Sequence, residues 1–379
     1  MPALGPNAHL IGQAGSRAQL STPALLLDFD AFERNVARMA AFCREHGVAL
    51  RPHAKTHKSV EIARKQLEAG AAGICCATIG EAERLANGGI GNLLITSPIV
   101  TAPKLRRLAA LQERSEGLMV VADTVAAVDA LARIAAAADR QLWVLVDLGV
   151  GRRRTGCSGT AAALAVARRI ARSNSLAFGG VQAYAGHLQH IAEVAERRRQ
   201  GAAEDVMVSE VLDRLAADRI TVPRVSGAGT GTHAIDAAGG LFSELQCGSY
   251  IFLDVDYAAV ALRDEEPRPF APALFVRTAV ISANADHHVT TDAGLKAFAT
   301  DGPRPLILCG APAGAEYFFF GDEHGRVELA DAPRHLPVGS ALECLTPHCD
   351  PTVNLYDVYH VVQDDTLIDV WPIDARGAI

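Results

Sequence analysis

The 379-residue sequence lacks several features that mark particular classes of protein. It contains no apolar run of 18 residues or more, which argues against a helix that crosses a bilayer. Residues 1–23 lack a basic start followed by a long apolar run, so we expect no secretory signal peptide. The eight cysteines form no CxxC pair and no disulfide framework, which favours a reduced compartment, and we expect a cytoplasmic protein.

The chain also lacks an excess of positive charge. Its formal net charge is -7 at pH 7, which argues against nucleic acid or an anionic membrane as a partner. Hydrophobic residues make up 49% and charged residues 21%, which is ordinary for a soluble globular protein. A chain of this size buries about 75% of its unfolded surface, so it needs neither disulfides nor a metal merely to fold.

Strand-like apolar runs alternate with alanine-rich helical segments through most of the chain, which implies parallel strands joined by helices. Asp30 and Thr124 are the expected N-caps of two of these helices. The pattern predicts an α/β fold, a (β/α)8 TIM-like barrel over residues 26–256; an open doubly wound sheet is the alternative. The eight runs are residues 48–54, 73–78, 92–97, 118–123, 142–148, 178–184, 221–226 and 244–253.

The pattern changes after Asp256. Short strand-like runs separated by Gly, Pro and Asp turns replace the alternation, which predicts a second, mostly β domain. We expect this domain to comprise residues 257–379 together with residues 1–25. Its expected strands are residues 274–283, 287–291, 305–309, 315–320, 325–329, 341–345 and 358–371.

A basic segment, residues 51–58 (RPHAKTHK), ends the first predicted barrel strand. Side chains alternate along a strand, so Arg51, His53 and Lys55 should share one face. Polar side chains at the upper end of a barrel strand belong to the active-site face. A lysine there can have a lowered pKa and form a Schiff base with a carbonyl, whereas the alternative is a solvated basic loop.

Three segments carry a resemblance to a known family: residues 21–35 (STPALLLDFDAFERN), 51–59 (RPHAKTHKS) and 73–83 (GICCATIGEAE). They resemble the fold-type III pyridoxal-phosphate enzymes, which are alanine-racemase-like barrels with a C-terminal β domain. The similarity is greatest to the D-threonine aldolase and D-serine dehydratase branch. The resemblance implies that Lys55 binds pyridoxal 5'-phosphate as a Schiff base and that Lys58 has no covalent role.

Two glycine-containing segments, residues 226–232 (SGAGTGT) and 246–250 (QCGSY), follow the seventh and eighth predicted barrel strands. Glycines let backbone N–H groups approach an anion closely, and barrels of this kind bind phosphate after strands 7 and 8. The first segment lacks the third glycine of a dinucleotide motif and the lysine of a P-loop. The resemblance also assigns both segments to the cofactor phosphate. The predicted phosphate-binding residues are Thr230, Gly231, Gly248, Ser249 and Tyr250.

The resemblance further implies which groups lie near the cofactor ring. Arg154 begins an R-x-G element that the family places there, although adjacent arginines are also typical of a solvated turn. Tyr184 ends the sixth strand and either contacts the cofactor or packs in the barrel core. Alanine racemases place an arginine against the pyridine nitrogen, and Gln246 stands at that position here. We expect Arg154 to contact the nitrogen, which leaves the role of Gln246 open.

A candidate metal pair follows near the C-terminus. On an extended backbone His348 and Asp350 face the same way and Cys349 faces the other way. A nitrogen and a carboxylate completed by water suit Mn²⁺ or Mg²⁺, whereas a cysteine ligand would favour Zn²⁺. The segment resembles the aldolase branch, in which a His and an Asp at this spacing bind a divalent cation. We expect Mn²⁺, with Mg²⁺ or Co²⁺ as alternatives.

A general base is expected in the loop after the sixth strand, residues 185–190 (AGHLQH). A histidine has a pKa near neutrality and is a natural proton acceptor. The Gln-His element resembles the catalytic histidine of the family, so we predict His190, with His187 as the second candidate. A solvated or structural histidine is the alternative in such a loop.

The resemblance implies a carbon–carbon lyase that cleaves a small D-3-hydroxy-α-amino acid, such as D-threonine, to glycine and an aldehyde. The alternatives are a 3-hydroxyaspartate aldolase, a D-serine or 3-hydroxyaspartate dehydratase, a non-catalytic cofactor carrier and a metal-dependent barrel hydrolase. The last leaves Lys55 and both phosphate segments unexplained. The family is commonly homodimeric, and the roles of Asp292, Lys296, Glu323 and His324 stay open.

Overall fold

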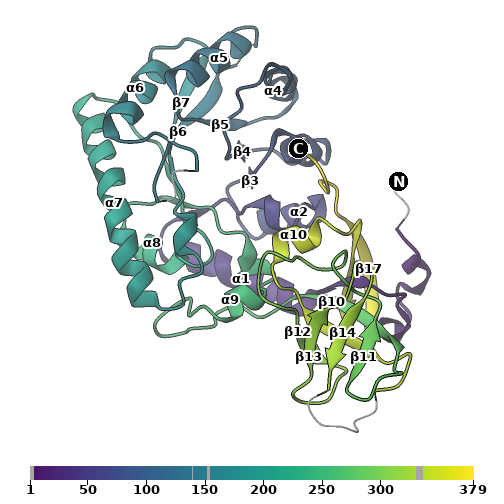
Figure 1. Ribbon diagram of the computed structural model, residues 1–379. Coiled ribbons are helices and arrows are strands. Elements are labelled where there is room, and N and C mark those ends of the chain that lie inside the picture. Colours follow the sequence, from purple (N-terminus) through teal and green to yellow (C-terminus); the bar gives the residue numbers. More distant parts are fainter. Residues whose placement is uncertain (1–3, 139, 152–153, 330–335) are drawn as a thin grey trace.

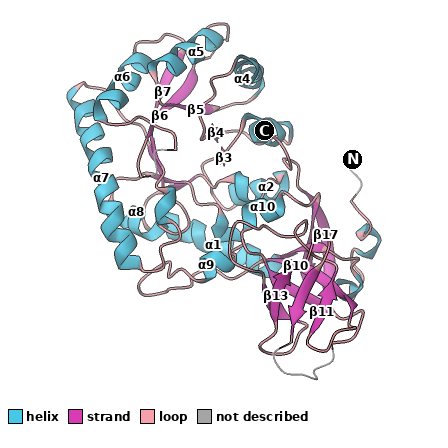
Figure 2. Ribbon diagram, viewed as in Figure 1, coloured by secondary structure: helices cyan, strands magenta, loops and turns pink. Residues whose placement is uncertain are grey.

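The computed structural model describes residues 4–138, 140–151, 154–329 and 336–379. Two bodies stand side by side, a barrel ringed by helices and a separate mostly β domain (Figure 1). The helices lie outside the barrel strands, whereas the second body consists mainly of strands (Figure 2). No helix among the described residues has the length and apolar character needed to cross a bilayer.

The barrel consists of eight parallel strands, as the sequence predicts. The sheet order is β2-β9-β8-β7-β6-β5-β4-β3. An isolated parallel bridge between His53 and Cys75, with Cys75 N donating to Pro52 O at 2.8 Å, joins the two ends of this sheet. The strands are β2 (Ala49–Leu50), β3 (Ile74–Cys76), β4 (Leu93–Ile95), β5 (Met119–Ala122), β6 (Leu142–Leu148), β7 (Leu176–Ala183), β8 (Val225–Gly227) and β9 (Glu244–Leu245).

Helices alternate with these strands. Thr124 caps its helix as predicted, because its side chain accepts from Ala127 N. The prediction of Asp30 as a cap is wrong: Asp28 accepts from Ala31 N, and Asp30 lies inside the first turn. The helices are α1 (Phe29–Glu45), α2 (Val60–Glu68), α3 (Ile79–Asn87), α4 (Ala102–Arg114), α5 (Val125–Ala135), α6 (Thr160–Ala171), α7 (Val194–Ala217), α8 (His233–Gly239) and α9 (Val255–Ala258).

The second body is a nine-stranded sheet in which β13-β14-β11-β10-β1-β16-β17 are neighbours and β15 joins β10 to β12. Its strand β1 (Ala24–Asp28) pairs with β10 and β16, so residues 26–28 lie in this sheet rather than in the barrel. The other strands are β10 (Leu274–Ser282), β11 (His288–Thr291), β12 (Leu306–Cys309), β13 (Glu316–Phe319), β14 (Gly325–Glu328), β15 (Ala341–Leu345), β16 (Val358–Gln363) and β17 (Thr366–Pro372).

A short helix of the second body, α10 (Cys349–Val353), connects it to the barrel. Asp350 of this helix pairs with Lys55, and the Tyr359 hydroxyl of β16 donates to His57 O at 2.7 Å. Both contacts reach the loop that follows β2. The β domain therefore closes one side of the barrel at the carboxyl ends of its strands, where such barrels carry their active sites.

Candidate active site

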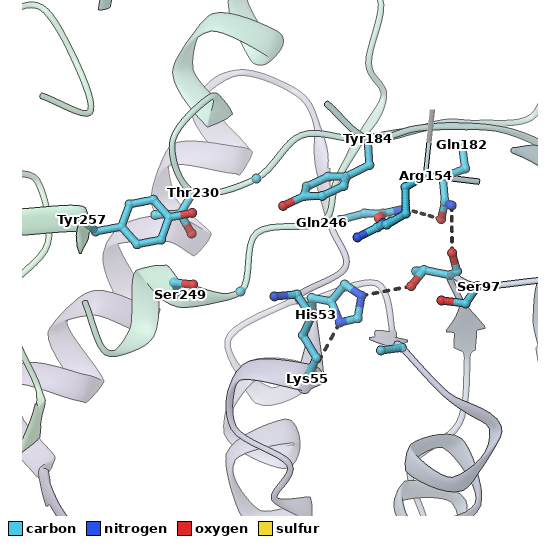
Figure 3. A pocket seen from close by; sticks show the side chains of 14 residues that line it. His53, Lys55, Ser97, Arg154, Gln182, Tyr184, Thr230, Gln246, Ser249 and Tyr257 are labelled. Carbon is cyan, nitrogen blue, oxygen red and sulfur yellow. Dashed lines mark hydrogen bonds between the residues drawn. The ribbon is translucent and has the colours of Figure 1, made fainter. Parts of the chain in front are cut away.

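A pocket of about 690 Å³ opens at the carboxyl ends of the barrel strands. Side chains from the ends of β2, β7 and β9 converge on it together with residues of the loops that follow (Figure 3). Its lining is polar, which suits a ligand with several charged groups. The lining residues are His53, Lys55, Ala77, Thr96, Ser97, Arg154, Gln182, Tyr184, Gly229, Thr230, Gln246, Gly248, Ser249 and Tyr257.

Lys55 lies in the short 3-10 turn Ala54–Thr56 that follows β2, and its ammonium pairs with Asp350. Burial lowers the pKa of Lys55, but the neighbouring Asp350 carboxylate outweighs burial and holds it above its ordinary value. Burial raises the pKa of Asp350, but Lys55 dominates and lowers it to about 2. The pKa of Lys55 is therefore not lowered here, because Asp350, the predicted metal ligand, supplies a counter-ion.

The two neighbours of Lys55 on the predicted strand face have separate environments. His53 Nδ1 accepts from Lys55 N at 3.3 Å, and Nε2 lies 3.0 Å from Thr96 Oγ1. Burial lowers the pKa of His53 well below its usual range, so the ring is neutral. Arg51 instead lies in the barrel interior, where its Nε is 3.0 Å from Glu244 Oε2.

A cradle of small residues forms the end of the pocket away from Arg154. Gly229, Thr230, Gly248 and Ser249 line it, and the buried Thr230 Oγ1 has no hydrogen-bond partner in the described part of the chain. A Cβ atom at Gly229 would lie 2.4 Å from Gln189 Oε1, and one at Gly248 would lie 2.6 Å from Thr56 Oγ1. A larger residue at either position would displace the Gln189 or Thr56 side chain.

Two predicted phosphate-binding residues lie just behind this cradle. Gly231 N donates to Gln189 Oε1 at 2.9 Å. The Tyr250 side chain is fully buried, and its hydroxyl accepts from Gln66 Nε2 at 3.1 Å. The structure therefore places Gly231 and the Tyr250 ring as supports of the cradle rather than in the pocket lining.

Arg154 and Tyr184 both line the opposite part of the pocket. The guanidinium carbon of Arg154 lies 5.8 Å from the centroid of the Tyr184 ring, within cation–π range. The adjacent Arg152 and Arg153 fall outside the described residues. The sequence expectation that Arg154 and Tyr184 share one site is consistent with this arrangement.

His190 lies beside the pocket rather than in its lining. Its Nδ1 is 3.2 Å from Asp256 Oδ2, and its ring centroid is 4.6 Å from that of Tyr257, which does line the pocket. His187 is directed elsewhere, with Nε2 at 3.5 Å from Glu204 Oε1. Within the described part of the chain, a ring contact links His190, but not His187, to a pocket residue.

The predicted metal pair sits at the start of α10. His348 is the N-cap residue and Asp350 lies in the first turn, so the expectation of a continuous extended backbone is wrong here. His348 Nδ1 lies 2.9 Å from Asp301 Oδ2. Asp350 Oδ1 is buried without a hydrogen-bond partner in the described part of the chain. Over residues 4–138, 140–151, 154–329 and 336–379, no three His, Cys, Asp or Glu side chains form a metal-binding group.

Several pocket residues were not predicted from the sequence. Gln182 lies on β7, two residues before Tyr184, which directly follows the strand; alternation continued to Tyr184 puts both side chains on one face and could have indicated Gln182. Thr96 and Ser97 are the last residues of the predicted strand run 92–97, and the end of that run could have indicated that they line the pocket. Tyr257 belongs to α9, and no local sequence signal connects it with the pocket.

Comparisons with known proteins identify the family. The model for the alanine racemase N-terminal domain matches residues 27–256, and the D-ser_dehydrat model, a serine dehydratase domain, matches residues 273–362. A D-threonine aldolase of Arthrobacter sp is 39% identical over 365 residues, covering 95% of this chain and 94% of that protein. A 3-hydroxy-D-aspartate aldolase of Paracoccus denitrificans (strain Pd 1222) is 35% identical over 366 residues, covering 95% and 93%.

A crystal structure of D-threonine aldolase from Filomicrobium marinum superposes with a TM-score of 0.91 at 34% identity, covering 96% of this chain and 97% of that chain. The fold and the pocket thus define an enzyme with an alanine-racemase-like barrel. The chain belongs to the alanine-racemase-like family of pyridoxal-phosphate enzymes that carry a serine-dehydratase-type C-terminal domain. It is a lyase of this family.

Proposed function

We propose that the protein is a pyridoxal-phosphate- and divalent-metal-dependent aldolase that cleaves D-3-hydroxy-α-amino acids, with D-threonine yielding glycine and acetaldehyde. One observation carries the proposal: the Lys55 amine enters a pocket whose far end is a cradle of Gly229, Thr230, Gly248 and Ser249. A primary amine and an anion-binding cradle in one pocket match a ligand with an aldehyde and a phosphate.

The residues present fit this cofactor. The unpartnered Thr230 Oγ1 and the glycines at positions 229 and 248 offer donors and close backbone approach to a phosphate. The cofactor, when bound, supplies an electron sink for the carbanion left after the carbon–carbon bond breaks. Lys55 would hold the cofactor through its amine, and Arg154 and Tyr184, which line the same pocket, would lie beside its ring.

His348 and Asp350 are the residues that would hold the divalent ion. Asp350 Oδ1, which has no hydrogen-bond partner among the described residues, and the His348 imidazole would supply oxygen and nitrogen donors, and water would contribute the remaining ligands. A hard cation there, Mn²⁺ by this donor set, would lower the pKa of a substrate β-hydroxyl. Asp350 contacts Lys55, so the ion would lie beside the reacting end of the cofactor.

His190 is the proposed acceptor of the β-hydroxyl proton. The Asp256 carboxylate lies 3.2 Å from Nδ1, so Nε2 is the ring nitrogen that would accept the substrate proton. Contact with Tyr257 places the ring next to the pocket. Transfer through one intervening water would bridge the remaining separation.

The protein is further proposed to act in the cytoplasm as a homodimer. The eight cysteines are free in the structure, as expected of a reduced compartment. Exposed apolar side chains on β12, Leu306 and Leu308, provide part of the surface that a second copy would cover.

A 3-hydroxyaspartate aldolase is the second candidate, and the 35% identical relative from Paracoccus denitrificans supports it. The two candidates share the chemistry and differ in the substrate side chain. One assay separates them: purified enzyme is supplied with cofactor and Mn²⁺ and then incubated separately with D-threonine, D-serine and D-3-hydroxyaspartate.

Glycine plus acetaldehyde from D-threonine, at the highest kcat/KM of the three, is the expected result. Preferred cleavage of 3-hydroxyaspartate to glycine and an aldehyde would select the second candidate. A keto acid plus ammonia would overturn the aldolase proposal and indicate a dehydratase.

A further inference from the structure

The barrel interior beneath the pocket contains a buried polar network that the proposed function leaves without a role. Its centre is Gln246, which follows β9 and lines the pocket. One arm leads to Gln182 and Asp147, and the other leads to Ser226 and Glu244. These five side chains belong to residues that are at most 4% exposed, so each polar atom depends on its partners.

The first arm fixes the orientation of the Gln182 amide. Gln182 Nε2 donates to Thr96 O at 3.1 Å and to Asp147 Oδ1 at 2.9 Å. A backbone carbonyl can only accept, so the nitrogen of Gln182 must face Thr96 whatever the charge on Asp147. Gln182 Oε1 is therefore presented to Gln246, and it accepts from Gln246 Nε2 at 3.2 Å.

The second arm fixes the Ser226 hydroxyl. Glu244 Oε2 lies 3.0 Å from Arg51 Nε, so the carboxylate is paired with a buried guanidinium and serves as an acceptor. Ser226 Oγ donates its one proton to Glu244 Oε1 at 2.7 Å. The hydroxyl can then only accept from Gln246, whose Nε2 lies at 2.9 Å.

The side-chain amide of Gln246 thus donates its two N–H groups to Gln182 Oε1 and Ser226 Oγ in the pocket wall. A flipped Gln246 amide would set its oxygen against Gln182 Oε1 and against a Ser226 oxygen that has no proton left. No hydrogen bond from another described residue reaches Gln246 Oε1, and the residue lines the pocket (Figure 3). The pocket wall therefore displays a fixed hydrogen-bond acceptor.

We propose that Gln246 Oε1, instead of Arg154 as expected from the sequence, contacts the ring nitrogen of the cofactor and accepts a hydrogen bond from its protonated form. Gln182 and Ser226 are then positioning residues that hold the amide in this orientation. The inference rests on the proposed function, which supplies the cofactor. In the cofactor, the ring carbon that bears the phenol oxygen is next to the carbon that bears the aldehyde, so the phenol oxygen would stay near Lys55. The ring nitrogen is on the opposite side of the ring from the aldehyde-bearing carbon. An unprotonated nitrogen would face an acceptor with no proton between them, so this wall favours the pyridinium form.

The test is the ¹⁵N chemical shift of ring-¹⁵N-labelled pyridoxal phosphate bound to the otherwise unlabelled protein, measured by solid-state NMR near neutral pH. The wild type should show the shift of a protonated nitrogen, and Gln246→Glu should keep it because a carboxylate is also an acceptor. Gln246→Arg, which presents only donors, should move the shift to that of an unprotonated nitrogen.

Gln182→Leu tests the positioning role, because it frees one Gln246 N–H and lets the amide turn. Its bound label should show a lower protonated fraction than the wild type, whereas the exposed control Gln141→Leu should match the wild type. A role confined to packing would leave the shift unchanged in the folded variant.

The wild-type measurement decides the matter even where a variant fails to fold. A bound label with an unprotonated nitrogen overturns the inference and leaves the proposed function standing. A Gln246→Arg protein that binds the label in protonated form also overturns it. A label that remains free in solution contradicts the proposed function and this inference together.

Discussion

At the scale of single residues, burial decides which side chains carry a charge. Asp236 is an example outside the pocket: it accepts from Thr232 Oγ1 at 2.6 Å beneath the glycine-rich turn. Burial, with a smaller contribution from the Asp205 charge, raises the pKa of Asp236 to about 7. The native carboxyl therefore stays protonated at pH values where the unfolded chain has already ionised it.

Asp236→Asn should change how stability varies with pH. Between about pH 4 and 7 the native state binds the proton more tightly, so the contribution of Asp236 falls as pH rises. The variant has no such carboxyl group. Its free energy of unfolding, relative to that of the wild type, should therefore rise by on the order of 2 kcal/mol from pH 5 to pH 8. Urea unfolding of both cofactor-free proteins at the two pH values measures it. If the difference in unfolding free energy between variant and wild type is the same at pH 5 and pH 8, the raised pKa of Asp236 is contradicted.

His190→Ala should lower kcat by about 10²- to 10⁴-fold while cofactor binding persists, because a proton acceptor is lost and the cradle is untouched. Steady-state kinetics with D-threonine and a cofactor titration measure the two effects. The matched control is His187→Ala, since His187 pairs with Glu204 away from the pocket. Unchanged kcat in His190→Ala would remove His190 from the mechanism.

Pocket residues were predicted where a local pattern marks them. Lys55, Arg154 and Ser249 lie in short recognisable segments, and all three line the pocket. Tyr257 and the Asp256–His190 contact were missed because they depend on how α9 packs against a loop over 60 residues away. Contacts of that kind are set by the tertiary fold.

At the scale of elements, the loop after β7 and the glycine-rich turn after β8 act as one unit. Gln189 joins them: its Oε1 accepts from Gly231 N at 2.9 Å, and its Nε2 donates to Thr232 Oγ1 at 3.2 Å. Gln189 is 1% exposed, so nothing else can replace these bonds. The cradle therefore takes its shape from the loop that also bears His190.

Gln189→Ala should weaken cofactor binding about tenfold, since loss of these bonds leaves a buried N–H unpaired, at a cost of about 1–3 kcal/mol. Fluorescence titration of the cofactor-free protein measures the dissociation constant. Gln141→Ala is the control, because this exposed glutamine donates to Asn174 O at 3.0 Å on the surface. An unaltered dissociation constant would show that the cradle holds its shape without Gln189.

The elements themselves were largely predictable. All eight barrel strands fall within or next to the predicted runs, because apolar runs separated by helical segments have few alternative pairings. Two local expectations were wrong. Asp28 rather than Asp30 caps α1, and α10 begins inside the predicted extended metal segment. Both errors concern the residue at which a helix begins, and moving a helix start by one or two residues changes the free energy little.

At the scale of the whole molecule, the β domain completes the pocket of the barrel. α10 brings Asp350 to Lys55, although the two residues are 295 positions apart in the chain. The sequence predicted a barrel and a second, mostly β domain, which the two sheets confirm. It did not predict that Asp350 would neutralise Lys55, because the docking of the two bodies has no local signal.

His348→Ala, or exhaustive chelation of the wild type, should abolish turnover while the cofactor stays bound, because the proposed ion site lies in the β domain and the cradle lies in the barrel. Activity assays and the visible absorption of the bound cofactor separate these effects. His9→Ala is the control, since the His9 ring lies near the N-terminus, with Nδ1 2.9 Å from Pro6 O. Turnover that survives chelation, with no metal detected, would contradict the metal role.

The most direct test of the central claim is to reduce the cofactor-loaded protein with borohydride and locate the modified peptide by mass spectrometry. The account predicts one phosphopyridoxyl group, on Lys55, and none on Lys58, which is paired with Glu81 at 2.7 Å. Modification of Lys58 or another lysine, or an unmodified chain, would contradict the account.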